Sequence, residues 1–130
     1  LGADGFGDEK MIELAGAINV SNVFYTGHFS SLAPANDTVQ PFIDSFKEKY
    51  GEEPSTFNAL SYDAMFMIKA AIEAKDSADS ASITEGLATL EDFEGVTGSI
   101  TMDENHNPKK SVVVIGFEDG KEDSAETINP

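Results

Sequence analysis

The sequence has 130 residues, of which 40% are hydrophobic and 25% charged, a balance typical of a folded globular protein rather than a disordered one. Eight basic residues stand against 24 acidic ones, giving a formal net charge of −16 and no basic patch to neutralise nucleic-acid phosphates. The absence of cysteine excludes disulfides and thiol chemistry, and no apolar run approaches the roughly 20 residues of a membrane-spanning helix.

The chain opens with a glycine-rich loop that holds one acid close to one aromatic residue. Glycines at positions 2, 5 and 7 allow the backbone to turn sharply and approach a ligand closely, and they leave Asp4 projecting from the loop near Phe6. A carboxylate presented in this way suits a compact cation such as an α-ammonium group, through charge-assisted hydrogen bonds. These residues alone also fit an ordinary surface turn that contains an aspartate.

Hydrophobic spacing predicts four helices, and residues that can cap a helix mark where most of them begin. The helices are expected over residues 9–17 with Asp8 as N-cap, over 39–50 with Asp37 and Gln40 as a capping box, over 55–75, and from Ser82 with Glu85 as its capping partner. The third helix has almost no polar face between Tyr62 and Ala74, so we expect it to be buried on several sides.

Runs rich in β-branched and aromatic residues predict strands over residues 22–26, 99–102 and 111–117. Residues 103–108 read as a polar connection and residues 118–121 as a tight turn. The rest of the chain reads as an acidic tail with a short strand near Thr127 and Ile128. Helices that alternate with strands indicate an α/β fold.

Two loops are similar to known ligand sites but lack residues that those sites require. Residues 103–107 place oxygen ligands at alternate positions, as a calcium loop does, but Pro108 replaces the required glycine and Val114 the required glutamate. Gly5-Phe6-Gly7 before a helix is similar to a dinucleotide loop, but Lys10 occupies the position of the third glycine. We therefore favour a hairpin connection and a simple turn.

No cofactor, metal or catalytic activity is expected from the remaining residues. His28 and His106 lack the paired spacing of a zinc site and read as surface or loop histidines. No motif sets a nucleophile beside its base, which disfavours an enzyme.

Six short motifs occur in an order that is informative as a set. They are LGADGF at 1–6, FKEKYG at 46–51, Pro54, SYDA at 61–64, DFEGVTG at 92–98 and DGK at 119–121. In these motifs, over residues 1 to about 121, the chain resembles the C-terminal part of a branched-chain amino-acid-binding protein. This family is the leucine/isoleucine/valine type of periplasmic-binding-protein-like receptor for ABC transporters.

The resemblance implies a partial periplasmic-binding-protein-like type I fold, with pieces of two three-layer α/β lobes that close over an amino acid. By this analogy residues 1–27 are a segment of the C-terminal lobe and 28–110 a segment of the N-terminal lobe. Residues 111–130 would form the hinge return and the tail of the C-terminal lobe. Neither lobe is complete, and the chain starts in what reads as the end of a strand, so we expect it to be cut from a longer protein. Exposed sheet edges of this kind allow self-association.

The resemblance also implies roles for single residues. Asp4, with Gly5 in the same loop, would take the α-ammonium group of the ligand. Phe6, where the family often has Trp, would lie near the ligand, and Phe57 would line the side-chain pocket because it follows Pro54. The alternative readings are a turn acid, a hydrophobic staple on the first helix and a core aromatic. In the family, the groups that hold the ligand's carboxylate belong to a part outside this chain.

Together these expectations describe the non-catalytic substrate-binding component of an ABC importer for branched-chain or other aliphatic amino acids. Its partners would be the small-molecule amino acid and the membrane permease of the transporter, with no nucleic acid. Its place would be extracytoplasmic, in the periplasm or on the cell surface as a lipoprotein. The same fold also serves as the ligand-sensing domain of receptors and regulators, and this alternative stays open. A fragment of an α/β enzyme is the least supported reading.

Overall fold

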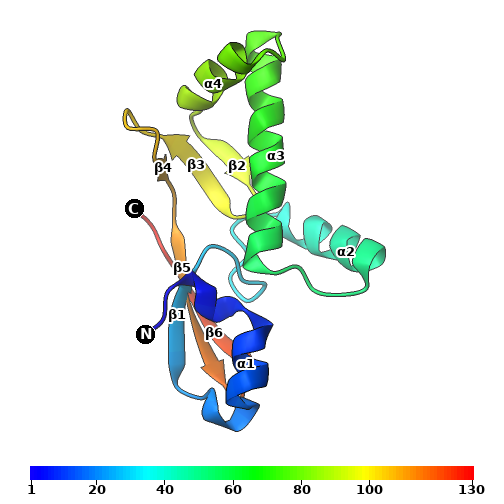
Figure 1. Ribbon diagram of the computed structural model, residues 1–130, viewed down its shortest axis with the longest axis vertical. Helices are drawn as coiled ribbons and strands as arrows, with labels where there is room; N and C mark the ends of the chain where they lie inside the picture. Colours follow the sequence, from blue (N-terminus) through cyan, green and yellow to red (C-terminus); the bar gives the residue numbers. More distant parts are fainter.

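The computed structural model describes residues 1–130, with only the backbone described for Glu9. The chain forms two units joined by two crossings (Figure 1). We call residues 1–27 and 112–130 the sheet unit and residues 39–109 the helical unit. The first crossing, residues 28–38, leads from the sheet unit to the helical unit, and the second crossing, residues 110–111, leads back.

The sheet unit is built on three antiparallel strands in the order β1-β5-β6. They are β1 (Val23–Gly27), β5 (Val112–Glu118) and β6 (Lys121–Ile128). Strand β5 is central because its alternating apolar side chains can be covered, and Ile115 is fully buried. Its core also contains Val20, Tyr25, Val113 and Phe117, against which Met11 and Ile12 pack.

Strand β6 differs from the acidic tail expected for this region. The predicted tight turn at 118–121 is confirmed, with positive φ angles of 49° at Asp119 and 72° at Gly120. That turn starts a hairpin, and β6 then pairs with β5 from Glu118↔Lys121 to Val112↔Ile128, with one shift of register between Gly116 and Phe117. The expectation of a tail was wrong because a strand at a sheet edge is stabilised by backbone pairing and needs few apolar side chains.

Helix α1 (Glu9–Ala15) covers one face of this sheet (Figure 1). The predicted N-cap is confirmed, since the Asp8 side chain accepts a hydrogen bond of 2.8 Å from the backbone N–H of Lys10. The helix ends two residues earlier than expected, because Gly16 adopts a φ of 81°. Short 3-10 helices flank it, η1 (Asp4–Gly7) before and η2 (Ala17–Asn19) after.

The helical unit combines three helices with a small antiparallel sheet of order β2-β3-β4. The elements are α2 (Val39–Tyr50), α3 (Thr56–Lys75), α4 (Ser80–Ala88), β2 (Phe93–Gly95), β3 (Gly98–Met102) and β4 (Pro108–Lys109). Helices α3 and α4 approach closely where Gly86 lies against Ala71, so that a Cβ on Gly86 would come within 2.8 Å of the Cβ of Ala71. A separate core contains Phe29, Val39, Phe42, Ile43, Ala59 and Val96.

The polar connection predicted at 103–108 is confirmed as the turn between β3 and β4. The Asp103 side chain accepts hydrogen bonds of 2.8 Å from the backbone N–H groups of Asn105 and Asn107. These bonds hold the turn from within.

The capping box predicted for α2 is wrong. The Asn36 side chain, rather than that of Asp37, accepts a hydrogen bond from the backbone N–H of Thr38, at 3.0 Å. Gln40 reaches forward along the helix and donates a hydrogen bond of 2.8 Å to Asp44. Asn36 makes this bond because its side chain closes a turn directly before the helix, so Asp37 does not cap the helix.

The start predicted for α4 is also wrong, by two residues. Asp79 is the N-cap, and its carboxylate accepts hydrogen bonds from the backbone N–H groups of Ala81 and Ser82 at 3.1 and 3.0 Å. Ser82, expected as the cap, lies inside the helix, and Glu85 pairs instead with Lys75 at 2.7 Å. An aspartate outcompetes a serine here because an ionised cap binds the helix N-terminus more strongly.

Helix α3 is not buried on several sides, contrary to the expectation from its composition. Met65 is 65% exposed and Phe66 is 41% exposed. One side of α3 packs on α4 and β2 (Figure 1). Near its start α3 also contacts α2, where the Tyr62 and Phe42 ring centroids are 4.8 Å apart. An exposed apolar helix face of this kind is typical of a surface that another segment or another protein covers.

Candidate ligand-binding cleft

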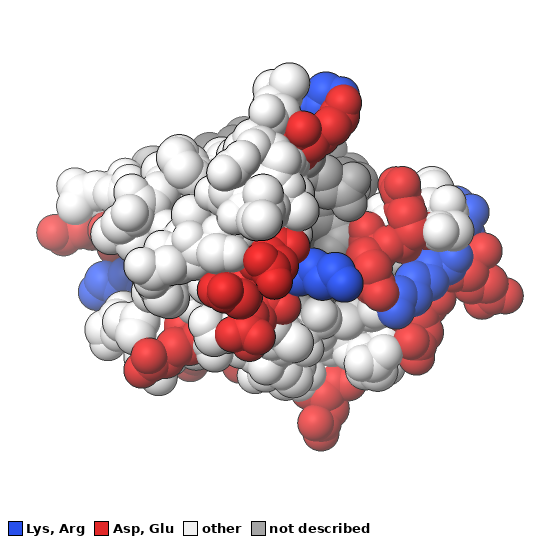
Figure 2. Space-filling model, turned by 90° about the horizontal axis from the view of Figure 1, so that it is seen from below, with Lys and Arg blue, Asp and Glu red and all other residues white. Residues whose placement is uncertain are grey.

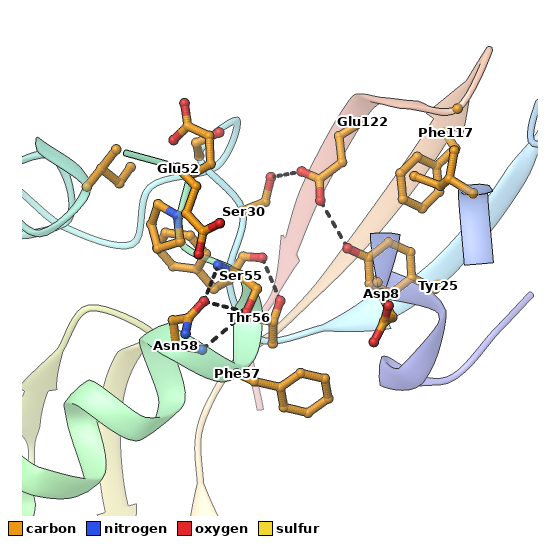
Figure 3. Close-up of a pocket in the computed structure, with 18 residues that line it drawn as sticks. Asp8, Tyr25, Ser30, Glu52, Ser55, Thr56, Phe57, Asn58, Phe117 and Glu122 are labelled. Atoms are coloured by element: carbon orange, nitrogen blue, oxygen red, sulfur yellow. Dashed lines mark hydrogen bonds between the residues drawn. The ribbon is translucent and has the colours of Figure 1, made fainter. Parts of the chain in front are cut away.

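A cleft of about 480 Å³ opens between the two units. One wall comes from the sheet unit, with Tyr25, Phe117 and Glu122, and the other from the start of α3 (Figure 3). Phe29 and Ser30 of the first crossing also line it. Both units and the first crossing therefore contribute to a single concave surface, which is where binding sites are commonly found.

The start of α3 forms a rigid wall because a capping box and a bond to the first crossing hold it in place. The Ser55 side chain and the Asn58 side chain each accept from the other's backbone N–H, which completes a capping box (Figure 3). The Thr56 hydroxyl donates a hydrogen bond of 3.3 Å to the carbonyl of Phe29, which ties the helix to the first crossing. Phe57 is 50% exposed and extends from this rigid start into the cleft.

The opposite wall is organised by Glu122 of β6. Its carboxylate accepts a hydrogen bond of 3.0 Å from the Tyr25 hydroxyl and one of 2.9 Å from the Ser30 hydroxyl (Figure 3). The Tyr25 ring stacks on Phe117 with the ring centroids 5.4 Å apart. Burial, reinforced by the Glu122 carboxylate, raises the pKa of Tyr25, so the phenol keeps its proton and donates a hydrogen bond to Glu122.

The second crossing is held by a different polar group, on the side of the helical unit. Asp63 of α3 is only 2% exposed and accepts hydrogen bonds from the backbone N–H groups of Val96 and Thr97, both at 2.8 Å. The Thr97 hydroxyl also donates to Asp63 at 2.6 Å, and it accepts from the Lys110 ammonium group at 2.6 Å. This chain of bonds links α3 to the residue from which the second crossing starts.

The charged side chains that line the cleft are all acidic. Carboxylates of Asp8, Glu52, Glu53 and Glu122 line it, and its described lining contains no lysine, arginine or histidine. Acidic side chains also predominate on the face of the molecule seen from below in Figure 2. Such a surface attracts cationic groups and repels phosphates and other anions.

A metal site has no support in this arrangement. Among the described residues, no group of three or more His, Cys, Asp or Glu side chains is placed to hold a metal ion. The carboxylates of the cleft are engaged in part by the protein itself, since Glu53 pairs with Lys47 at 2.5 Å.

The predicted site residues lie in two places. Phe57 lines the cleft, whereas Asp4, Gly5 and Phe6 belong to η1 and are not part of its lining. Asp4 is exposed, and its carboxylate accepts a hydrogen bond of 2.9 Å from the backbone N–H of Gly5. The Phe6 ring lies over Gly2, where an added Cβ would come within 2.3 Å of the ring. The roles of these residues in ligand binding stay predictions.

Three important residues of the cleft were missed by the sequence analysis, namely Tyr25, Ser30 and Glu122. A signal for Glu122 was present, because Asp119-Gly120 between two extended runs is typical of a two-residue hairpin turn. Reading that turn as a hairpin would have placed Glu122 on a strand beside β5. No local signal distinguishes Ser30 from other small residues of the first crossing.

Comparison with known proteins identifies the family. The sequence profile of the family described as "Periplasmic binding protein" matches residues 2–121. The chain belongs to the periplasmic binding protein family. Members of this family are binding proteins rather than enzymes. A comparison with curated proteins finds no match.

Solved structures of this family match both the sequence and the fold. The branched-chain amino acid transporter substrate-binding protein LivJ from Streptococcus pneumoniae, in complex with isoleucine, is 36% identical with a TM-score of 0.89. The leucine-binding protein LivK from Thermotoga maritima is 38% identical with a TM-score of 0.88. An ABC transporter substrate-binding protein from Desulfitobacterium hafniense, in complex with Leu, is 26% identical with a TM-score of 0.72.

The coverage of these matches is unequal. The LivJ and LivK matches each cover 98% of this chain and 36% of the other protein, and the third covers 81% and 31%. This chain therefore spans about a third of the length of these relatives, and its fold is a partial periplasmic-binding-protein fold of the α/β class. No helix among the described residues is long and apolar enough to cross a membrane.

Proposed function

We propose that this chain is part of the substrate-binding protein of an ABC importer for branched-chain or other aliphatic L-amino acids. The observation that carries the proposal is the match over 98% of the chain, at 36% identity, to a substrate-binding protein that holds isoleucine. The match to a leucine-binding protein at 38% identity supports the same ligand class.

Within this proposal the sheet unit is a segment of the C-terminal lobe and the helical unit a segment of the N-terminal lobe. The chain itself is then the C-terminal part of the longer protein. The two crossings act as part of the hinge, and the lobes close over the ligand. The cleft between the two units supports this reading, because both of its walls belong to elements that the crossings join.

Asp4 is proposed to bind the α-ammonium group, and Gly5 to let the backbone approach the ligand. Phe6 and Phe57 provide apolar surface for the ligand side chain. The exposure of Asp4 on η1 and of Phe57 at the start of α3 supports these roles, because a ligand can reach both side chains. The groups that hold the ligand's carboxylate are proposed to lie outside this chain.

The proposed partners are the amino acid and the membrane permease of the importer. Family membership indicates an extracytoplasmic place, and we propose the periplasm or a lipoprotein on the cell surface. When the chain is separated from the rest of the longer protein, we propose that it self-associates through the exposed face of α3, where Met65 and Phe66 lie.

A chimera tests the proposal directly. The 130-residue chain replaces the matching segment of the LivJ protein of Streptococcus pneumoniae, and L-leucine and L-isoleucine are titrated into the folded product by calorimetry. We expect binding of both amino acids and no binding of the leucine analogue that lacks the ammonium group. A chimera that unfolds cooperatively but binds neither amino acid would contradict the proposed function.

The 130-residue chain alone is the second arm of the experiment. We expect no measurable affinity for leucine, because the groups proposed to hold the ligand's carboxylate lie outside the chain. Micromolar binding by the chain alone would mean that it builds a complete site, for example by self-association.

A further inference from the structure

His28 stands where the chain leaves β1 and enters the first crossing. Residues at the N-terminus lie alongside β1, since the Gly2 N–H donates to the carbonyl of Phe24 at 2.7 Å and the Thr26 N–H donates to the carbonyl of Gly2 at 3.2 Å. This is a parallel bridge between Gly2 and Tyr25. Two residues after Gly2 the chain enters η1 at Asp4, and two residues after Tyr25 strand β1 ends at Gly27, directly before His28.

Asp4 and His28 therefore occupy the carboxyl ends of two adjacent parallel segments. In α/β proteins this is the edge at which ligands bind, because the chain turns away there and leaves side chains and backbone free. The two residues are 24 positions apart, and no sequence pattern connects them. The structure brings a carboxylate and an imidazole to the same edge.

The surroundings of His28 favour its neutral form. Its Nδ1 atom is buried and has no hydrogen-bond partner in the described chain. A proton on Nδ1 would thus be a buried donor without an acceptor, whereas a bare Nδ1 costs less. The small cavity beside it, about 10 Å³ in volume, has no other titratable group in its lining.

Two charged groups shift the pKa of His28 in opposite directions. Burial and the ammonium group of Lys110 in the second crossing lower the pKa of His28, while Asp4 raises it, helped by the backbone of Ser111. The ammonium group of Lys110 is fixed by its bond to Thr97, so its charge stays close to the crossing. Asp4 is exposed, so a cation from solvent can reach its carboxylate.

We propose that His28 sets the affinity of Asp4 for a cationic group. When the imidazole is neutral, the Asp4 carboxylate takes its counter-charge from a ligand. When the imidazole is protonated, it supplies that positive charge itself and repels an ammonium group, so the ligand binds less tightly. The ligand part of this inference rests on the proposed function of Asp4, and His28 acts through Asp4 rather than by touching the ligand.

Reciprocity follows from linkage. If protonation of His28 weakens the binding of a cation at Asp4, the bound cation must make His28 harder to protonate by the same factor. Removal of the Asp4 charge should act on His28 in the same direction. The coupling can therefore be measured without any ligand, in the 130-residue chain itself.

The first test follows the two histidines by NMR during a pH titration of the chain and of its Asp4→Asn variant. We expect the pKa of His28 to fall in Asp4→Asn, while the titration of His106, which is exposed in the turn between β3 and β4, stays the same. Asp123→Asn removes an exposed carboxylate from β6 as a matched control and should shift neither histidine. An unchanged His28 in Asp4→Asn, or an equal shift in the control, overturns the inference.

The second test measures leucine affinity of the chimera at about pH 7.5 and at about pH 5, on either side of the usual histidine range. We expect the Kd to rise severalfold at the lower pH, and a His28→Gln variant to lose this dependence while keeping the affinity seen at the higher pH. Binding with the same pH dependence in both proteins overturns the role of His28 and leaves the proposed function standing. Absence of binding at either pH overturns the proposed function instead, and the NMR titration still decides whether Asp4 and His28 are coupled.

Discussion

The carboxylate of Glu122 accepts a hydrogen bond of 2.9 Å from the hydroxyl of Ser30, a residue 92 positions earlier in the chain. This bond fixes the first crossing to the sheet unit, and Ser30 is only 3% exposed as a result. The second crossing is fixed to the opposite unit, because Lys110 bonds to Thr97. The first crossing is also tied to the helical unit, because the Thr56 hydroxyl donates to the carbonyl of Phe29 at 3.3 Å. The Asn36 side chain likewise donates to the carbonyl of Gly95 at 2.8 Å. Bending between the units is expected between these anchors, in residues 31–35 of the first crossing and after Lys110 in the second.

Replacing Glu122 with alanine is expected to destabilise the chain by about 1–3 kcal/mol, because the buried Tyr25 hydroxyl and the Ser30 hydroxyl would lose their acceptor. The free energy of unfolding in urea measures this effect. Asp123→Ala is the matched control on the same strand and should change stability by no more than about 0.5 kcal/mol. Equal effects of the two substitutions would mean that Glu122 acts only as a strand residue.

Replacing Asp63 with asparagine is expected to cost about 2–4 kcal/mol of stability. The Asp63 carboxylate accepts from two backbone N–H groups and one hydroxyl, and an amide would turn one of its acceptors into a donor facing Thr97. Loss of the Asp63 acceptor would also weaken the bond that holds Lys110, because the Thr97 hydroxyl bonds to both Asp63 and Lys110. Urea unfolding measures the change.

Asp44→Asn on α2 is the control for Asp63, because it is an exposed aspartate on a neighbouring helix. It is expected to change stability by about 0.5 kcal/mol or less. A loss below about 1 kcal/mol in Asp63→Asn would show that water replaces the protein donors at this site.

The helices and three of the six described strands, β1, β3 and β5, could be predicted from the sequence because local signals specify them. Asp8 before an apolar periodic run marks the start of α1, and the alternation in residues 112–118 marks β5. Local signals fail where two of them compete, as at α4, where Asp79 is a stronger cap than Ser82. They also fail for β6, whose partner strand stabilises it more than its own side chains do.

The cleft was predictable only in part, because its contacts are non-local. Phe57 follows Pro54 and lies at a helix start, and both features can be read from the sequence. Glu122 meets Tyr25 from 97 positions away, and no periodicity reports such a contact. The exposed face of α3 was predicted as buried because composition reveals that a surface is apolar, but not which segment covers it.

Replacing Asp4 with alanine in the chimera is expected to weaken leucine binding by about 2–4 kcal/mol, because an ammonium group in a closed cleft would lose its counter-charge. Calorimetry measures the change in affinity. Asp123→Ala is the control, since it removes an exposed carboxylate from the same unit. Unchanged affinity in Asp4→Ala would rule out Asp4 as the ammonium ligand and would leave the match to amino-acid-binding proteins unaffected.

Stability of the 130-residue chain is expected to depend on His28 at mildly acidic pH. Its pKa lies below the usual value of 6.5 in the folded protein, so below that value the unfolded chain binds more protons than the folded one. The contribution of His28 is therefore fully present above about pH 6.5 and is lost as the pH falls toward the folded pKa.

The difference in unfolding free energy between the chain and its His28→Gln variant isolates this contribution. Acidification also relieves repulsion within a chain of net charge −16, but both proteins share that gain, so it cancels in the difference. We expect the difference to shrink steadily from about pH 7 to about pH 5. His106→Gln is the matched control, because it removes an exposed histidine from the turn between β3 and β4. A difference for His28→Gln that is constant with pH would mean that the imidazole titrates alike in the folded and unfolded chain.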